Sequence, residues 1–316
     1  MTNFHHKTRV RVPATTANLG PGFDTLGLAL QIYNFVGIEP SLSGADKIVA
    51  MGEGASTLQN GDPAKNIALQ AAQELWRQLE LPPTPFKLSL ENAIPLARGL
   101  GSSSAARVGA LVAANDLAQK LHGQSADRST LLTLATKLEG HPDNVAPALL
   151  GGLIISLTRE FGEVVASRAP IEKFPRLVVF VPQSELETKT ARGVLPTHIS
   201  MADATFNIAR ASFLVNALIK EEWEYLGEAL RDKLHQDHRA ALMPAYDGVV
   251  RAATLAGALG ATLSGAGPCV LAWLPDESAI VENTIIAMQN AAAELGVLGA
   301  ALEVAVDLEG CVVVEN

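Results

Sequence analysis

The sequence has very few cysteines, and its first residues do not predict a secretion signal. Cys269 and Cys311 are its only cysteines in 316 residues, and they lie far apart without CxxC spacing. A disulfide framework or a structural zinc site is therefore disfavoured, and a reducing compartment is favoured. Residues 1–10 carry charge and lack the apolar run of a signal peptide. We therefore expect a cytoplasmic protein.

Basic residues are scarce relative to acidic ones. The 24 Lys and Arg residues against 33 Asp and Glu residues give a formal net charge of −9. Nucleic acids and membrane surfaces are anionic, so this balance disfavours both as partners. A local basic pocket for a small anion is still compatible with it. The uncharged stretch 252–275 contains several glycines and threonines, and it predicts a helix, a polar turn and a buried strand rather than a membrane span.

Length and composition indicate a folded protein of about two domains. Hydrophobic residues make up 48% of the chain and charged residues 18%, which argues against disorder. Predicted strands and helices interleave, which gives an α+β class in two layers. The strands are expected at 9–12, 86–90, 153–157, 177–181 and 311–314, and the helices at 66–81, behind residue 101, and at 131–138, 203–218, 222–234 and 279–295. Pro13 is expected to end the first strand, with a loop over 14–22, and the polar connection 158–175 to hold a domain boundary.

The strongest chemical signal is the run Gly99-Leu-Gly-Ser-Ser-Ser-Ala-Ala106. Glycines let backbone N–H groups approach an anion, and the start of the following helix reinforces the attraction. The three serines add hydroxyls that can bond phosphate or a metal ion. The chain contains no Gly-Lys pair of a Walker loop, and Ser104 replaces the third glycine of the dinucleotide fingerprint. The run predicts phosphate binding, with a plain serine N-cap as the alternative.

Two further segments gather polar side chains. Asn18 and Asp24 lie on a loop of small residues, where a carboxylate can hold an ammonium group. An Asx turn is the alternative. The run Glu139-Gly-His-Pro-Asp-Asn144 follows a predicted helix, and Glu139 suits Mg²⁺, which takes few carboxylates together with phosphate oxygens. The alternative is that these residues only end the helix and form an exposed turn.

Other candidates lie in the second half of the chain. Arg192 and Arg239 offer planar donors that suit carboxylates and phosphates, although each alone is more typical of an ordinary surface residue. His235 and His238 lie three apart, but no third metal ligand is apparent. The run 263–269 predicts close backbone approach to a ligand or another loop, or a tight turn. Cys269 within it is interpreted as a small buried apolar residue.

Together these segments resemble one family. Pro95–Ala106 resembles the second motif of the GHMP kinases, and Ser264–Pro268 resembles their third. Pro13–Asp24 and His141–Pro147 resemble the homoserine kinase branch in particular. The resemblance extends from Val10 to Cys269, and the combination of motifs is more specific than any one of them.

The resemblance implies a two-domain α+β fold. The N-terminal domain, 1–166, would be ribosomal-protein-S5-like and bind ATP, and the C-terminal domain, 167–316, would be ferredoxin-like. ATP and Mg²⁺ are the implied cofactors, L-homoserine is the implied substrate, and a homodimer is implied. The implied reaction is phosphorylation of the homoserine hydroxyl to O-phospho-L-homoserine, a step towards threonine.

The site residues that the resemblance implies fall into three groups. The loop around the ATP phosphates would comprise Pro95, Leu96, Ala97, Arg98, Gly99, Leu100, Gly101, Ser102, Ser103, Ser104 and Ala105, with Asn66 near the adenine. Ser103 and Glu139 would hold Mg²⁺. The homoserine site would comprise Asn18, Asp24, His141, Asn144, Arg192 and Arg239. Asn144, Thr188 and Arg192 would serve the reaction itself, with Thr188 near the transferred phosphate.

The chemistry of homoserine agrees with this assignment independently. Its ammonium group needs a carboxylate, which Asp24 supplies. Its carboxylate needs arginine, and Arg192 and Arg239 supply two. Its hydroxyl needs a neutral partner, and Asn144 fits. Phosphoryl transfer depends on alignment and charge neutralisation, so an enzyme without an evident base is plausible.

Two other functions compete with this interpretation. A related kinase acting on mevalonate or a sugar would leave Asp24 without an ammonium partner. A regulatory module without activity would have no need of the Gly/Ser loop together with Glu139. The sequence leaves open a general base, the choice between Glu139 and Asp143 as Mg²⁺ ligand, the oligomeric state, and inhibition by threonine.

Overall fold

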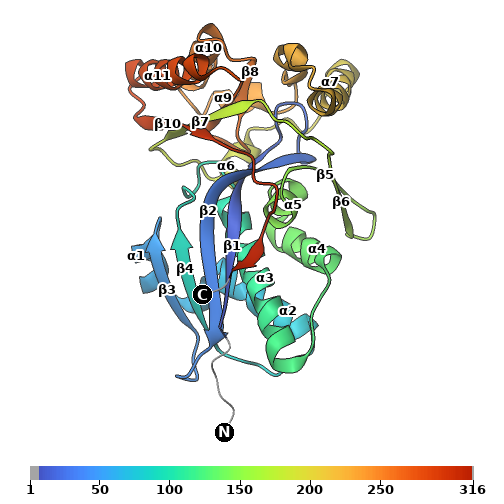
Figure 1. Cartoon of the computed structure of the whole chain (residues 1–316), viewed down its shortest axis with the longest axis vertical. Coiled ribbons are helices and arrows are strands. Elements are labelled where there is room, and N and C mark those ends of the chain that lie inside the picture. Colours follow the sequence, from blue (N-terminus) through green and yellow to red (C-terminus); the bar gives the residue numbers. More distant parts are fainter. Residues whose placement is uncertain (1–6, 315–316) are drawn as a thin grey trace.

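The computed structural model describes residues 7–314 and places their strands in two sheets at opposite ends of an elongated molecule (Figure 1). The first sheet has the order β11-β1-β2-β4-β3, and β5 pairs with β2 and with β6. Only β3 and β4 pair in parallel. Its strands are β1 (Thr8–Ala17), β2 (Leu26–Pro40), β3 (Lys47–Gly52), β4 (Phe86–Asn92), β5 (Leu153–Thr158), β6 (Val164–Arg168) and β11 (Val312–Val314).

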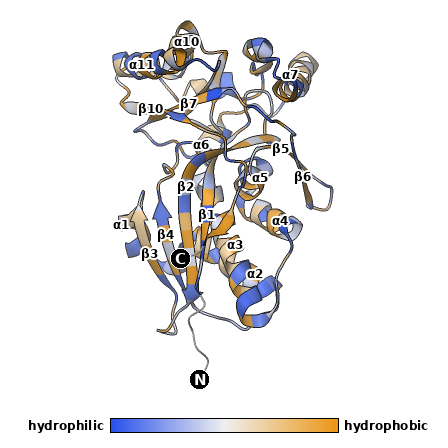
Figure 2. Cartoon of the chain, in the orientation of Figure 1, coloured by the Kyte–Doolittle hydropathy of each residue, from blue (hydrophilic) through white to orange (hydrophobic). Residues whose placement is uncertain are grey.

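Helices pack against one face of the first sheet (Figure 1). They are α2 (Ile67–Gln78), α3 (Ser102–His122), α4 (Arg128–Glu139) and α5 (Pro142–Leu150), while α1 (Ala55–Asn60) and a 3-10 turn at Pro63–Lys65 link β3 to α2. A Cβ on Gly109 of α3 would lie 2.7 Å from Val36 Cγ2, so glycine permits close packing of this helix on the sheet. Figure 2 shows hydrophobic residues concentrated on β1, β2 and α3. This packing fixes the position of the first turn of α3.

The second sheet has the antiparallel order β10-β7-β9-β8. Its strands are β7 (Arg176–Pro182), β8 (Gly260–Leu263), β9 (Val270–Leu274) and β10 (Gly299–Val304), and α10 (Tyr246–Leu255) and α11 (Ser278–Glu294) pack on it. Taken in chain order, strands and helices alternate as in a ferredoxin-like βαββαβ unit, as predicted. Between β7 and α10 lie α6 (Thr188–Gly193), α7 (Met201–Lys220), a 3-10 turn at Trp223–Tyr225, α8 (Leu226–Ala229) and α9 (Gln236–Ala240).

The first strand is longer than predicted. Pro13 does not end β1, which continues to Ala17. The register between β1 and β2 shifts between Pro13 and Ala14. A bulge accommodates a residue that has no N–H to donate, so proline is tolerated there. The predicted loop over 14–22 therefore begins only at Asn18.

The predicted helix at 222–234 is also wrong beyond Ala229. The side chain of Asp232 accepts hydrogen bonds from the backbone N–H groups of Leu234, His235 and Gln236. A carboxylate that binds nearby N–H groups in this way competes with helical hydrogen bonds. The segment is a turn that leads into α9.

The two sheets do not correspond to two continuous halves of the chain. After β10, the chain returns to the first sheet, where β11 pairs with β1. A boundary between residues 166 and 167 falls inside β6, and the division at that point stays a prediction. The other predicted strands and helices are found near their expected places, including a helix, a Gly-rich turn and a buried strand within 246–274.

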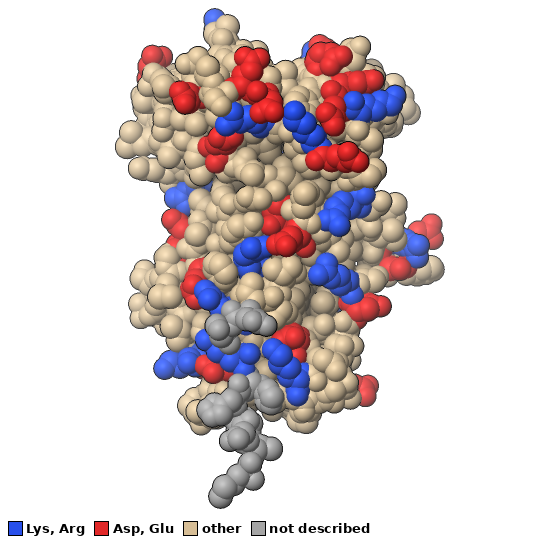
Figure 3. Space-filling view, in the orientation of Figure 1, with Lys and Arg blue, Asp and Glu red and all other residues tan. Residues whose placement is uncertain are grey.

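Several smaller expectations concern buried and charged residues. Cys269 and Cys311 are free and buried, as interpreted for Cys269. No helix among residues 7–314 is long and apolar enough to cross a membrane. The face drawn in Figure 3 intersperses basic and acidic side chains over both halves of the molecule.

Candidate active site

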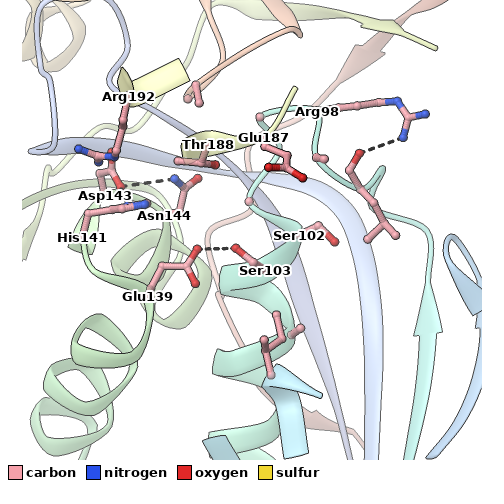
Figure 4. Close-up of a pocket in the computed structure, with 18 of the residues that line it drawn as sticks. Arg98, Ser102, Ser103, Glu139, His141, Asp143, Asn144, Glu187, Thr188 and Arg192 are labelled. Carbon is pink, nitrogen blue, oxygen red and sulfur yellow. Dashed lines mark hydrogen bonds and ion pairs between the residues drawn. The ribbon is translucent and has the colours of Figure 1, made fainter. Parts of the chain in front are cut away.

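A cavity of about 350 Å³ is lined by residues from both halves of the molecule. All predicted site residues line it except Pro95, Leu100, Ser104 and Ala105, and the last three of these are buried in the core. In Figure 4 the labelled side chains of α5 and of the α3–α4 region lie opposite those of α6. The structure therefore brings predicted residues from widely separated segments into one cavity.

Three loops meet at the wall of this cavity. Ser264 Oγ lies 2.7 Å from the carbonyl oxygen of Gly99, and the N–H of Gly265 donates to the carbonyl of Ala17. A Cβ on Gly99 would lie 2.1 Å from the carbonyl oxygen of Ser264. The close backbone approach predicted for run 263–269 is thus contact with the loop before α3 and with the end of β1.

The first turn of α3 forms the phosphate-loop end of the cavity. Gly101 is its N-cap residue, in the left-handed region with φ +69°, and no side chain caps the helix. The alternative of a plain serine N-cap is therefore wrong. A Cβ on Gly101 would lie only 1.9 Å from Thr15 Oγ1. The uncapped N–H groups of the first turn, beside Ser102 and Ser103, form a site suited to an anion.

Glu139 lies directly beside this turn. It accepts hydrogen bonds from Ser103 and Ser104, and it forms an ion pair with Arg107. Its side chain is only 8% exposed. Arg107 was not among the predicted residues, because a single arginine one turn into a helix carries no motif. Among residues 7–314, no group of three or more His, Cys, Asp or Glu side chains could hold a metal ion.

The two carboxylates of the predicted cluster 139–144 have different partners. Glu139 contacts α3, whereas Asp143 contacts its neighbours His141 and Asn144. Asp143 Oδ1 lies 2.6 Å from His141 Nδ1 and 3.4 Å from Asn144 Nδ2. Burial lowers the pKa of His141, but the hydrogen bond and charge of Asp143, with the charge of Glu139, outweigh this and raise it. Asn144 Oδ1 accepts a hydrogen bond from Thr15 Oγ1 at 2.8 Å. Asp143 therefore orients its two neighbours.

Asp24 and Arg192 bind each other. Arg192 donates to both carboxylate oxygens of Asp24, at 2.6 and 3.1 Å. Asp24 has φ +54°, and its N–H donates to Asn18 Oδ1 at 3.0 Å. Asn18 Nδ2 in turn donates to the carbonyl of Gly265 at 2.8 Å. The sequence assigned these two charges to opposite ends of a substrate and did not predict their mutual pairing.

Arg239 is not the surface residue that its type suggests when taken alone, since it is only 1% exposed. Its Nε donates to the carbonyl of Ala191, and its Nη1 donates to that of Gly265 and contacts His235 Nδ1. Burial and the charge of Arg192 lower the pKa of Arg239 to about 10. Its Nη2 has no hydrogen-bond partner among the described residues, and Arg239 lines the cavity.

Arg98 has a different role from the rest of its loop. Its guanidinium donates to the carbonyls of Leu96, Pro182 and Gln183 at 2.8 to 3.0 Å. These contacts fasten the loop before α3 to the end of β7. The side chain is thereby committed to protein acceptors.

Sequence reasoning missed a largely apolar wall at the other end of the cavity, beside Asn66. Leu58, Ile67, Ala68, Leu90 and Asn92 form it together with Leu96, which had been predicted only as part of the phosphate loop. Glu187, directly before Thr188, also lines the cavity and was missed. Apolar residues of strands and helices look alike in a sequence whether they face a core or a ligand, so no signal distinguished these.

Comparison with known proteins identifies the family. Residues 66–152 match the model of the GHMP kinases N terminal domain, and residues 214–283 match that of the GHMP kinases C terminal domain. A homoserine kinase of Moorella thermoacetica is 47% identical over 264 residues, covering 84% of this chain and 86% of that protein. A homoserine kinase of Desulfitobacterium hafniense is 42% identical over 306 residues, 97% of this chain and 99% of that protein.

This chain belongs to the homoserine kinase family of the GHMP kinases. The crystal structure of homoserine kinase from Cytophaga hutchinsonii matches it with a TM-score of 0.87 and 27% identity, over 99% of both chains. The predicted two-domain GHMP kinase fold is confirmed. The prediction of a kinase that phosphorylates a hydroxyl group is confirmed by the same matches.

Proposed function

We propose that this chain transfers the γ-phosphoryl group of ATP to the terminal hydroxyl of L-homoserine, giving ADP and O-phospho-L-homoserine in the synthesis of threonine. One observation carries the proposal. A single cavity joins the uncapped first turn of α3 to the carboxylate of Asp24 and the guanidinium groups of Arg192 and Arg239. The first part suits a nucleotide phosphate, and the second matches the two charges of an α-amino acid.

The nucleotide is assigned to the end of the cavity near α2. The apolar wall of Leu58, Ile67, Leu90 and Leu96 suits an adenine ring. Asn66 Oδ1 caps α2 by accepting from the N–H groups of Ala68 and Leu69, which leaves its Nδ2 for a ligand. The phosphates would then extend to the loop at 95–105 and the first turn of α3. The backbone N–H groups there would hold them, because no loop lysine is present.

Mg²⁺ is assigned to Ser103 and Glu139. Their side chains are in direct contact, and Glu139 is held from three sides by Ser103, Ser104 and Arg107. One carboxylate and one hydroxyl fit a cation that takes its other ligands from water and phosphate oxygens. Asp143 is engaged with His141 and Asn144, which favours Glu139 as the ligand. The ion would neutralise charge on the transferring phosphoryl group.

Homoserine would replace the Asp24–Arg192 ion pair with its own two charges. Its ammonium would bind Asp24 and its carboxylate Arg192, so each side chain exchanges one opposite charge for another. Arg239 would add its Nη2 to the substrate carboxylate. Asn18 contributes by holding the N–H of Asp24, and His141 by lying between Asp143 and the cavity.

The reacting hydroxyl is assigned to the region between Asn144 and Thr188. Both line the cavity close to the first turn of α3, from α5 and α6 respectively. Asn144 Nδ2 can donate to the hydroxyl oxygen, and Thr188 to a phosphate oxygen. Alignment of this kind supplies much of the barrier reduction in phosphoryl transfer. We assign no general base, because Asp143 is occupied in orienting its neighbours.

The remaining assignments concern the setting in which the chain works. We propose a homodimer in the cytoplasm with neither a nucleic-acid nor a membrane partner. The free thiols support a reducing compartment, and the net charge of −9 supports the absence of nucleic-acid and membrane partners. The homodimer rests on the family resemblance alone. Sedimentation equilibrium of the purified protein tests the dimer, and a mass of one chain would contradict it.

The proposed reaction is tested by ADP release from ATP and Mg²⁺ with L-homoserine, mevalonate, galactose or no acceptor. Release with homoserine alone, with O-phosphohomoserine identified by ³¹P NMR, is the expected result. Release with mevalonate or galactose instead would retain the phosphate site and overturn the amino-acid site. Absence of release with every acceptor would contradict a homoserine kinase.

A further inference from the structure

His235 is fully buried, and each of its ring nitrogens faces a different partner. Nε2 lies 2.8 Å from the carbonyl oxygen of Gly20, and Nδ1 lies 3.2 Å from Nη1 of Arg239. A carbonyl oxygen can only accept a hydrogen bond and a guanidinium can only donate one. Both contacts are satisfied only when Nε2 carries the proton and Nδ1 carries none. The geometry therefore selects one neutral tautomer.

The charges around the ring agree with a neutral imidazole. Burial and the positive charge of Arg239 lower the pKa of His235, and together they outweigh the opposing influence of Asp232 and Asp24. Asp232 Oδ2 lies 3.7 Å from His235 Nε2, beyond a hydrogen bond. Asp232 instead accepts from the backbone N–H groups that begin α9. The carboxylate thus holds the backbone of His235 rather than its ring.

A second buried side chain strengthens the same connection. Asn207 of α7 donates from Nδ2 to Asp232 Oδ1 at 2.7 Å and to the carbonyl of Pro21 at 3.1 Å. The turn at 18–24 is therefore attached to the α9 region at two neighbouring carbonyls, those of Gly20 and Pro21. This turn includes Asn18, Leu19 and Asp24 in left-handed conformations, which persist only where the surroundings fix them.

We propose that His235 is a positioning residue that sets both charged ends of the amino-acid site at once. Through Nδ1 it holds the guanidinium of Arg239, and through Nε2 it holds the turn that presents Asp24. His235 does not line the cavity, so we assign it no contact with substrate or nucleotide. The inference rests on the proposed function, because it assigns Arg239 to the carboxylate of homoserine and Asp24 to the ammonium group.

The test compares His235→Leu with His235→Gln. Leucine fills a similar volume without polar atoms. Glutamine can donate to Gly20 through its amide nitrogen and accept from Arg239 through its amide oxygen. We expect His235→Leu to raise the KM for homoserine about 10-fold or more, because it removes a hydrogen bond to a charged group, Arg239. The KM for ATP should rise less than about 3-fold. His235→Gln should recover most of that loss.

A substrate analogue and a matched variant separate positioning from general damage. 3-Aminopropan-1-ol is homoserine without its carboxylate, so it cannot use Arg239. His235→Leu should therefore lose much of the preference for homoserine over this analogue, which the wild-type protein should show. His238 lies within α9, which begins directly after His235, and it is exposed to solvent. His238→Leu should therefore change neither the KM values nor the preference.

The outcomes distinguish this inference from the proposed function. If the wild-type protein does not phosphorylate homoserine, the proposed function fails. If it does, and His235→Leu raises both KM values equally or leaves the preference intact, only the role of His235 is overturned. Should the leucine variant not fold, ¹⁵N NMR of histidine-labelled wild-type protein, assigned with His235→Gln, decides the matter. A neutral Nε2–H tautomer from pH 6 to 8 is expected, and a protonated or Nδ1–H ring would contradict the proposal.

Discussion

The two ends of the cavity are built in different ways. The phosphate end comes from one continuous segment, in which a glycine-rich loop runs directly into α3. The amino-acid end is assembled from distant parts of the chain: Asp24 and Arg192, which bind each other, are 168 positions apart. A continuous site depends on its backbone, whereas an assembled site depends on the buried polar contacts that hold its parts together. The two ends should therefore fail in different ways when mutated.

The largest effect is expected from Gly101→Val at the phosphate end. The new side chain would overlap Thr15 Oγ1 and would have to adopt φ +69°. Strain and overpacking together cost about 2–6 kcal/mol. Displacement of the phosphate-binding turn would relieve the overlap at Thr15, so we expect up to this cost to appear as a fall in kcat/KM of about 30- to 25,000-fold. Steady-state kinetics with both substrates varied should show the loss chiefly in the KM for ATP.

The control for Gly101→Val lies at the other end of the same helix. Gly123 has φ +68°, but a Cβ there would meet nothing within 4 Å. Gly123→Val carries the same backbone strain without the steric overlap, so it should lower stability and leave the KM for ATP unchanged. Equal kinetic losses in the two variants would contradict a phosphate site at Gly101.

Arg239→Ala tests the assembled end. Loss of a charged hydrogen bond costs about 1.5–3 kcal/mol, so the KM for homoserine should rise about 10- to 150-fold and the KM for ATP much less. Arg231→Ala, which removes an exposed arginine from the turn before α9, should change neither value. A rise of the same size for both substrates in Arg239→Ala would argue against its contact with homoserine.

Glu139→Gln tests the junction between the two ends. The Mg²⁺ concentration that gives half the maximal rate should rise about 10- to 100-fold or more. Loss of an outer-shell partner of a metal ligand already lowers metal affinity by about that factor, and Glu139 is assigned as a direct ligand. Activity should recover partly in excess Mg²⁺. Asp143→Asn should leave that concentration unchanged. If instead Asp143→Asn shifts the Mg²⁺ dependence and Glu139→Gln does not, the metal assignment is reversed.

The smallest effect is expected from His141→Gln, and it depends on pH. The pKa of His141 is raised in the folded protein, so its stabilising contribution is complete below the unfolded value and disappears as pH rises through the folded value. Urea unfolding should therefore give wild type a free energy of unfolding about 1 kcal/mol larger than that of the variant at pH 5.5. This difference should be smaller at pH 8.5. A difference that does not shrink towards pH 8.5 would contradict this pairing with Asp143.

The contrast between the two ends also explains what could be predicted from the sequence. The Gly/Ser loop and the helix after it were predictable because glycines, serines and apolar spacing act locally. The pairing of Asp24 with Arg192 was not, because no local rule states which distant charges meet. The same holds for Arg107 beside Glu139.

The errors in the predicted elements have physical causes of the same kind. Pro13 was expected to end a strand, but a register shift against β2 accommodates it. The helix expected over 222–234 is interrupted because Asp232 captures three backbone N–H groups. In both places a specific tertiary or side-chain contact outweighs local propensity. The resemblance to a family supplied the residues of the assembled site, whereas the structure supplied the buried contacts behind them.

One measurement tests the central claim most directly: kcat/KM for homoserine, 3-aminopropan-1-ol and 4-hydroxybutanoate, in wild type, Asp24→Asn and Arg239→Ala. The two analogues lack the carboxylate and the ammonium group of homoserine, respectively. Asp24→Asn should lose discrimination only against 4-hydroxybutanoate, and Arg239→Ala only against 3-aminopropan-1-ol. Equal loss of discrimination against both analogues in either variant would contradict the division of the site into an ammonium side and a carboxylate side.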